Sequence, residues 1–261
     1  MTHAQRPPKR IDSRDNPRAK LWASLLTPRG LKKAGQFILA GRKTVPEALR
    51  TYPRFFETLL VTSPAQLTGW TLPPGLEVIE AGSALFQELD TSGTGFPLLI
   101  GTVPEMAQAD LTAAPRGLEL ICGLSDPSNL GALLRSAAAF GAARVVLLTE
   151  SAHPFHPKAL RAAANAQFSV ELVRGPSWSE LTAEAGHIAG PVLALDAGGA
   201  DLAAFTWPHN VRLLLGEEGL GVPPALDVAR LTVPTTGAVE SLNATVAASV
   251  ALYAYHTAHG K

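Results

Sequence analysis

Residues 118–261 alternate short apolar runs with helical segments, and this alternation limits the possible folds more than any other feature. The predicted strands cover 118–124, 144–148, 168–172, 192–195, 211–215 and 231–233, and the predicted helices 130–140, 157–165, 177–185 and 242–256. Short strands rich in Leu and Val, separated by helices, are typical of a mainly parallel sheet covered on both faces. The C-terminal half is therefore predicted to be an α/β domain.

The N-terminal half shows a second, smaller alternation of strands and helices. Residues 16–103 contain predicted strands at 37–40, 57–62, 76–79 and 96–103, with helices at 21–26, 45–49 and 83–89. This pattern favours a small α/β domain. Residues 104–117 contain two prolines and many small side chains and are predicted to be a linker. Residues 1–15, charged and holding Pro7 and Pro8, are predicted to be a disordered basic tail.

The net charge of zero conceals a strong asymmetry along the chain. Residues 1–43 hold eleven Lys and Arg against two Asp, a net charge of +9, and the remaining residues carry −9. A basic arm suits a polyanionic partner such as nucleic acid, although a purely solubilising tail has the same charge.

Several protein classes are disfavoured by composition. Cys122 is the only cysteine, so no intramolecular disulfide can form, and a reducing compartment fits. No apolar run approaches the roughly 18 residues of a membrane span, and the basic N-terminus lacks a secretory signal. The seven histidines show no H-E-x-x-H spacing, so no metal site is expected. We therefore expect a soluble cytoplasmic protein.

A first candidate motif, DPSNLGALLR at 126–135, follows a predicted buried strand, where ligands of such sheets bind. Asn129 is a plausible N-cap with an amide available to a ligand. Arg135 lies among apolar helix neighbours and is expected to need an anion or a hydrogen-bonded partner. An ordinary intramolecular ion pair would also satisfy it.

A second motif, LLLGEEGLG at 213–221, places glycines 216, 219 and 221 after an apolar strand, where a ligand can approach the backbone closely. The spacing is not the G-x-G-x-x-G of dinucleotide binders, which disfavours a nucleotide-dependent oxidoreductase. Glu217 and Glu218 would repel phosphate but suit a cation or hydroxyl groups. An ordinary surface turn explains the segment equally well.

A third motif, VPTTGAVESLN at 233–243, leads into the terminal helix. Ser241 is placed to cap that helix. The backbone of such a loop could hold the edge of an adenine ring. The simpler alternative is a capped helix with a structured approach loop.

Together, and in this order, the three motifs resemble those of the SpoU/TrmH family of RNA 2′-O-methyltransferases, a knotted class. The resemblance covers 118–261 and extends more loosely over 16–103, which looks like that family's RNA-binding extension. It implies a trefoil knot, which chain connectivity alone makes improbable. It also implies a homodimer and methyl transfer from S-adenosylmethionine to a ribose 2′-hydroxyl of RNA. The basic N-terminal extension suggests a structured target and favours ribosomal over transfer RNA.

The resemblance also assigns residues. Cofactor contacts would fall at Leu195, Gly216, Val233 and Leu242. Proton removal and orientation of the target would fall to Asn129, Arg135, Glu218, Ser241 and Asn243. A guanidinium is permanently charged and a poor base, so Arg135 could instead clamp a phosphate. A non-catalytic RNA-binding or ribosome-assembly protein with this fold is the alternative, and it would have no chemical reason to keep these five polar residues together.

Two departures from the family pattern stand out. The stretch PKALRAAAN has Ala163 where relatives have serine and Asn165 where they have glycine. Asparagine tolerates the left-handed backbone conformation, so the local path can persist. In the N-terminal half, Ala40 and Gly41 stand where relatives often have Glu-Gly, which bears on the RNA target.

Overall fold

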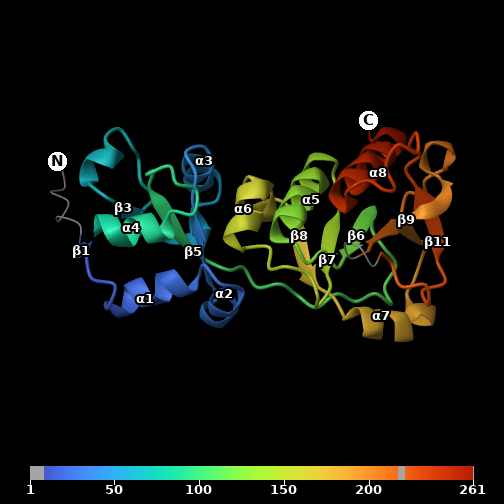
Figure 1. Cartoon of the computed structure of the whole chain (residues 1–261), viewed down its shortest axis with the longest axis horizontal. Coiled ribbons are helices and arrows are strands. Elements are labelled where there is room, and N and C mark those ends of the chain that lie inside the picture. The colour runs from blue at the N-terminus through green and yellow to red at the C-terminus, as the bar shows by residue number, and fades with distance from the viewer. Residues whose placement is uncertain (1–8, 217–220, 261) are drawn as a thin grey trace. The chain divides into compact units, whose positions relative to one another are not determined.

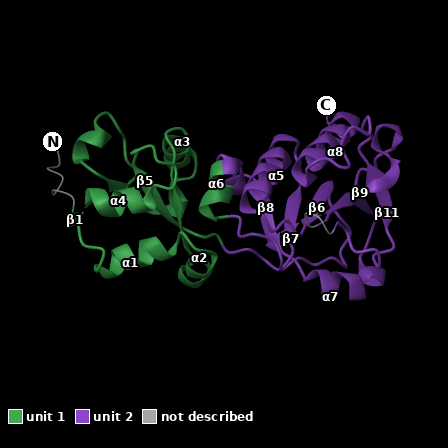
Figure 2. Ribbon diagram, viewed as in Figure 1, with its two compact units in different colours: residues 1–104, 155–161 green, residues 105–154, 162–261 purple. Residues whose placement is uncertain are grey.

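The computed structural model describes residues 9–216 and 221–260, which form two compact units (Figure 1). Unit 1 takes residues 1–104 and 155–161, and unit 2 takes 105–154 and 162–261 (Figure 2). Across the described ranges, every helix is too short or too polar to cross a bilayer.

Unit 1 is built on a mixed five-stranded sheet with the order β1-β4-β3-β5-β2. β1, β4 and β3 run parallel, and β5 is antiparallel to both β3 and β2. Its strands are β1 Lys9–Ile11, β2 Gln36–Leu39, β3 Phe56–Val61, β4 Glu77–Ala81 and β5 Leu98–Thr102, and its helices are α1 Pro17–Ser24, α2 Pro28–Ala34, α3 Thr44–Thr51 and α4 Ser83–Leu89. Buried aliphatic residues of β2, β3, β4 and β5 pack with α1 and α4 to form the core.

The prediction of a disordered tail over 1–15 is wrong for its second half. Lys9–Ile11 forms the edge strand β1, paired in parallel with β4. Arg10 forms an ion pair with Glu80 at 2.6 Å, and Ile11 is buried. These partners lie about 70 residues away along the chain, so the local composition of the tail could not reveal them. Residues 1–8 lie outside the described residues.

Unit 2 is built on a six-stranded sheet of order β11-β9-β10-β6-β7-β8, in which every pairing is parallel. Its strands are β6 Leu118–Cys122, β7 Arg144–Leu147, β8 Glu171–Arg174, β9 Val192–Asp201, β10 Val211–Leu215 and β11 Ala229–Thr232, and its main helices are α5 Pro127–Ala139, α7 Trp178–Ala183 and α8 Ala244–His259. α6 Pro157–Ala163 spans the boundary between the units. The predicted α/β architecture of both halves is confirmed, and the knot stays a prediction.

The predicted linker packs against unit 2 instead of running free. Gln108 forms a parallel bridge with Arg174 of β8, so the linker extends the sheet edge. Further on, the buried Arg212 of β10 donates to the carbonyls of Leu111 at 3.2 Å and Ala113 at 2.6 Å. The second half of the linker is therefore held against unit 2 by these hydrogen bonds, although residues 112–114 are exposed.

Two predicted helix caps are wrong, and the reason is the same for both. Asp126, not Asn129, caps α5 by accepting from the amides of Ser128 and Asn129. Asn243, not Ser241, caps α8 by accepting from the amides of Thr245 and Val246. In each case more than one residue of the motif can act as a cap, and only the observed helix start decides between them. α8 therefore begins after Asn243, and Ser241 lies on the loop that leads to it.

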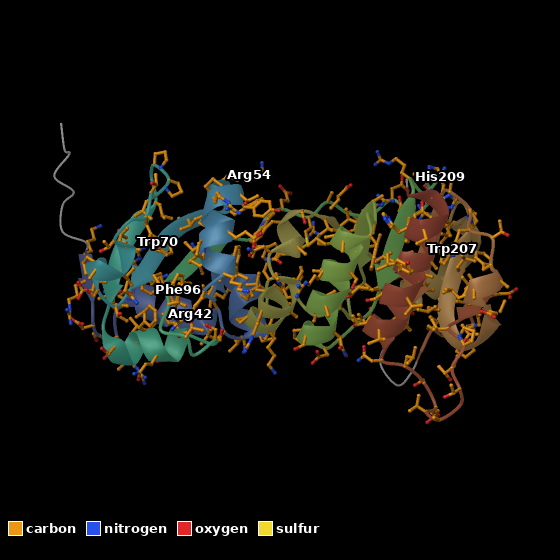
Figure 3. The ribbon with its side chains drawn as sticks, turned by 90° about the horizontal axis from the view of Figure 1, so that it is seen from above. Arg42, Arg54, Trp70, Phe96, Trp207 and His209 are labelled. Atoms are coloured by element: carbon orange, nitrogen blue, oxygen red, sulfur yellow. The ribbon has the colours of Figure 1, made fainter. Side chains whose placement is uncertain are left out.

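The C-terminal end of α8 is fixed by an aromatic anchor. The hydroxyl of Tyr255 donates to the carbonyl of His209 at 2.6 Å, and its ring meets Trp207 edge-on at 5.7 Å (Figure 3 labels His209 and Trp207). Burial raises the pKa of the Tyr255 phenol above its ordinary value, so the group stays protonated and remains a donor. The C-terminal end of α8 is thereby held against residues 207–209.

Candidate active site

A cavity of about 750 Å³ opens in unit 2 beyond the carboxyl ends of β10 and β11 and beside β9. Ligands of parallel α/β sheets bind at this edge because the strands end there and their loops diverge. The cavity is lined by Leu195, Asp196, Ala197, Leu215, Gly216, Gly221, Thr232, Val233, Pro234, Thr235, Glu240, Ser241, Leu242, Asn243, Ala244 and Ala247. Segments from β9, the second motif and the third motif therefore meet around one space.

A large bulge in β9 makes one wall of the cavity. Arg230 of β11 pairs with Ala194, whereas the next residue, Leu231, pairs with Ala200, so residues 195–199 leave the ladder. The hydroxyl of Thr232 donates to the carbonyl of Ala197 at 3.1 Å. This bond secures the bulge to β11, so the wall is held by backbone as well as by packing.

Two glycines allow backbone segments to approach each other at the cavity. A side-chain carbon at Gly199 would lie 2.4 Å from the carbonyl carbon of Arg230. One at Gly216 would lie 2.2 Å from the carbonyl carbon of Gly221. Neither position has room for a methyl group, which explains why the bulge and the second motif use glycine there.

Six of the nine residues that the sequence assigns to the site line this cavity. They are Leu195, Gly216, Val233, Leu242, Ser241 and Asn243. The structure thus brings together all four expected cofactor residues and two of the expected catalytic ones. Glu218, expected to take part in catalysis, lies outside the described residues.

The first motif reaches the third through Asn129. The side-chain amide of Asn243 donates to Oδ1 of Asn129 at 3.3 Å, and the hydroxyl of Thr245 donates to the carbonyl of Asn129 at 3.1 Å. These bonds tie the start of α5 to the start of α8. Asn129 therefore lies one hydrogen bond from the cavity wall.

Arg135 does not behave as the sequence predicts. Its neighbours Leu133, Leu134 and Ala137 are buried, but Arg135 itself is exposed on the other side of α5. Within the described part of the chain it makes no hydrogen bond or ion pair. The alternative of an intramolecular ion pair is wrong for the described residues, because sequence neighbours on a helix point in different directions, and the contact with an anion stays a prediction. An exposed guanidinium remains available to an external anion.

Sequence reasoning missed Asp196, a carboxylate on the wall of the cavity. Arg230 donates to Asp196 Oδ2, and the amide of Gly198 donates to Oδ1 at 3.2 Å. The one available signal was an acidic residue directly after the predicted strand 192–195. That signal is weak without the bulge, which turns this side chain toward the cavity.

The departure at Asn165 is accommodated as predicted. Asn165 takes φ +72° and the preceding Ala164 takes φ +47°. A left-handed conformation at a non-glycine residue is unusual, and asparagine adopts it more readily than most. The path of the chain after α6 is therefore kept without glycine, which confirms the expectation for this position.

The chemistry of the lining limits the ligand. The walls combine aliphatic side chains with two carboxylates, Asp196 and Glu240, and no Lys or Arg occurs among the residues that line the cavity in the described ranges. Such a site disfavours phosphates and suits a neutral or cationic molecule with apolar surface and hydroxyl donors. S-adenosylmethionine, a nucleoside that carries a sulfonium and no phosphate, fits a cavity with this lining.

Comparison with known proteins agrees with the geometry. The model of the SpoU rRNA Methylase family matches residues 120–253. The 23S rRNA (guanosine(2553)-2′-O)-methyltransferase RlmP of Bacillus subtilis is 33% identical over 94% of this chain and 98% of its own length. Ribosomal RNA small subunit methyltransferase G 2 of Syntrophobacter fumaroxidans is 38% identical over 95% of this chain, which spans only 49% of that protein.

A solved structure with a similar fold was determined with the cofactor bound. The SpoU methyltransferase AviRb of Streptomyces viridochromogenes, determined in complex with AdoMet, superposes with a TM-score of 0.75 at 25% identity, over 93% of this chain and 97% of that one. The chain belongs to the SpoU/TrmH family of S-adenosylmethionine-dependent RNA 2′-O-methyltransferases.

Proposed function

We propose that this protein transfers the methyl group of S-adenosylmethionine to a ribose 2′-hydroxyl of ribosomal RNA. The observation that carries the proposal is the convergence of the second and third motifs, with the β9 bulge, on one phosphate-excluding cavity. Relatives that match nearly the whole chain bear names of 23S rRNA 2′-O-methyltransferases. A ribosomal RNA substrate supports the further proposal that the protein acts in the cytoplasm.

The aliphatic residues Leu195, Val233 and Leu242 hold the adenosine part of the cofactor between them. When bound, the cofactor would supply an electrophilic methyl group, which a ribose oxygen can attack with the neutral thioether as the leaving group. Fixing the two reactants in line supplies a large part of the rate. The cavity walls hold the cofactor in the position that this alignment requires.

The polar residues that the three motifs assign to catalysis act on the RNA side. Asn243 and Asn129, joined by their side-chain bond, orient the ribose together with Ser241, and the carboxylate of Glu218 takes up the proton of the hydroxyl. Arg135, exposed and permanently charged, binds a phosphate of the target nucleotide. Proton transfer assisted by such groups contributes about 10²- to 10⁴-fold.

Unit 1 supplies the wider RNA contact. Five of its cations are engaged in ion pairs: Lys9, Arg10, Arg14, Arg18 and Lys20. Other cations of unit 1 are exposed and make no ion pair with any described residue: Arg29, Lys32, Lys33, Arg42, Lys43, Arg50 and Arg54. Unpaired cations on a compact domain suit the phosphate backbone of a structured RNA.

The test is methyl transfer to ribosomal RNA, measured together with RNA affinity across a salt series. The wild type is expected to leave a ribose methylation that resists alkaline hydrolysis. Lys32→Ala/Lys33→Ala is expected to bind RNA more weakly and to reduce the slope of log K against log salt by about 1.5, because two phosphate contacts are lost.

Arg14→Ala/Lys20→Ala removes two cations that are already paired and serves as the matched control, with an expected change near zero. RNA binding without methyl transfer would contradict the proposed activity. It would favour a non-catalytic RNA-binding protein that keeps this fold.

We further propose that the protein forms a homodimer through α8. Val246, Val250 and Tyr253 recur at helical spacing and are 50%, 38% and 57% exposed. α8 contains no Asp, Glu, Lys or Arg, so nothing in the helix opposes burial of this stripe. A second copy, which carries the same apolar stripe, is the natural cover in a two-fold interface.

Tyr253→Glu is expected to convert a dimer into a monomer, because it would bury two carboxylates close to the two-fold axis. Sedimentation equilibrium measures the mass directly. Ala183→Glu, on the exposed side of α7, is the control and is expected to remain dimeric. A monomeric wild type would contradict the dimer.

A further inference from the structure

We propose that Asp196, held by Arg230, is the acceptor for the two ribose hydroxyls of the cofactor. The inference rests on the proposed function, because it assumes that an adenosine-containing cofactor occupies the cavity. It assigns a recognition role to two residues outside the three motifs.

The position of Asp196 sets it apart from the other carboxylate of the cavity. Glu240 lies on the exposed loop 233–243, whereas Asp196 is part of the β9 bulge, whose path is fixed by the bond from Thr232 to Ala197 and by the close approach at Gly199. The side chain of Asp196 is 30% exposed and that of Arg230 is 25% exposed. The carboxylate of Asp196 is therefore accessible from the cavity, and the backbone that carries it is held in place.

The hydrogen bonds of Asp196 leave two acceptor positions open. A carboxylate has about four lone-pair sites, two on each oxygen. Arg230 fills one on Oδ2, and the amide of Gly198 fills one on Oδ1. One site on each oxygen remains among the described contacts. A vicinal diol offers two donors at matching spacing, so a ribose can satisfy both.

Arg230 explains why a hydroxyl pair, and not a cation, is the better ligand for Asp196. The ion pair largely neutralises the carboxylate, so little charge attraction remains for an ammonium or sulfonium group. Arg230 also reaches the carbonyl of Pro223 at 3.4 Å, which fixes its far end. The pair thus presents oriented acceptors with little net charge, and an acidic side chain is also the group that accepts from the ribose hydroxyl in dinucleotide-binding α/β folds.

The experiment is calorimetric titration of the full chain with S-adenosylhomocysteine and with its 2′-deoxy and 3′-deoxy analogues. The wild type is expected to bind at least one deoxy analogue about 10-fold more weakly than the parent compound, since a charge-assisted hydrogen bond is lost. Asp196→Ala is expected to weaken the parent compound by about 10- to 100-fold and to bind all three ligands within about twofold of one another. If removing the Asp196 side chain abolishes the effect of removing a ribose hydroxyl, the two groups are in direct contact.

Asp201→Asn is the matched control, because Asp201 is an exposed carboxylate on the same strand that does not line the cavity. It is expected to keep the wild-type ranking of ligands. Asp196→Leu, which keeps a side chain of similar length without an acceptor, repeats the test if the alanine variant unfolds.

Two outcomes overturn the inference in different ways. A wild type that binds all three ligands equally, or an Asp196 variant that still discriminates among them, rejects the role of Asp196 while leaving the cofactor assignment intact. Absence of S-adenosylhomocysteine binding by the wild type rejects the cofactor assignment itself, and the role of Asp196 with it.

Discussion

Gly216→Ala is expected to weaken S-adenosylmethionine binding by about 10- to 100-fold while leaving the protein folded. The added carbon would lie 2.2 Å from the carbonyl carbon of Gly221 and 2.5 Å from the amide nitrogen of Val222. Both are backbone atoms, so the segment that returns to the cavity must move. Overpacking of this kind costs about 1–3 kcal/mol, and here the displaced atoms are part of the cavity wall.

Calorimetric titration of the variant measures this loss, and circular dichroism checks the fold. Gly198→Ala is the matched control: it lies in the bulge beside the same cavity, but a carbon added there meets nothing within 4 Å. We expect Gly198→Ala to bind the cofactor within about twofold of the wild type. Equal binding by both variants would show that the contact at Gly216 does not shape the site.

Arg212→Met is expected to cost about 3–5 kcal/mol of folding free energy, the range observed when one partner of a buried ion pair is removed. Arg212 is fully buried, and its Nε donates to Glu119 at 3.0 Å. Its other nitrogens donate to the carbonyls of Leu111, Ala113 and Ala189. The substitution would leave these three carbonyls without this donor. Glu119, which is 1% exposed, would keep only Arg144 as an ion-pair partner.

Thermal unfolding should show a drop on the order of 10 °C or more for a unit of this size. Arg116→Met is the control, because its side chain is exposed and only its backbone amide bonds to Glu119. A shift of less than about 2 °C for Arg212→Met would contradict the assigned role of the buried cluster.

The sequence predicts the sheet of unit 2 well because its strands are short apolar runs bounded by turn residues. The predicted strand 211–215 coincides with β10, for example. The edge strand β1 was not predicted, because its pairing depends on residues about 70 positions away. Predicted strand 168–172 also lies too early: residues 166–168 form a 3₁₀ turn and β8 begins at Glu171, since apolar content alone does not locate a strand end.

The residues of the candidate site likewise fall into those that the sequence could identify and those that it could not. Leu195, Gly216, Val233 and Leu242 could be named in advance because each is placed by a recognisable motif or strand end. Asp196 could not, because its position depends on a break in register between β9 and β11 that no local pattern records. The exposure of Arg135 likewise follows from the direction in which α5 turns its apolar face, which apolar neighbours alone do not give.

Every wall of the cavity comes from residues 195–247, in the last quarter of the chain. During synthesis the ribosome must therefore release β11 and the start of α8 before any cofactor can be retained. Chains that stop earlier cannot sequester it, whatever the state of unit 1. Once the chain is complete, cofactor at 100 times its dissociation constant would add about 2.7 kcal/mol to the stability of the folded form. Cofactor supply would then set how long finished molecules survive heat or proteases.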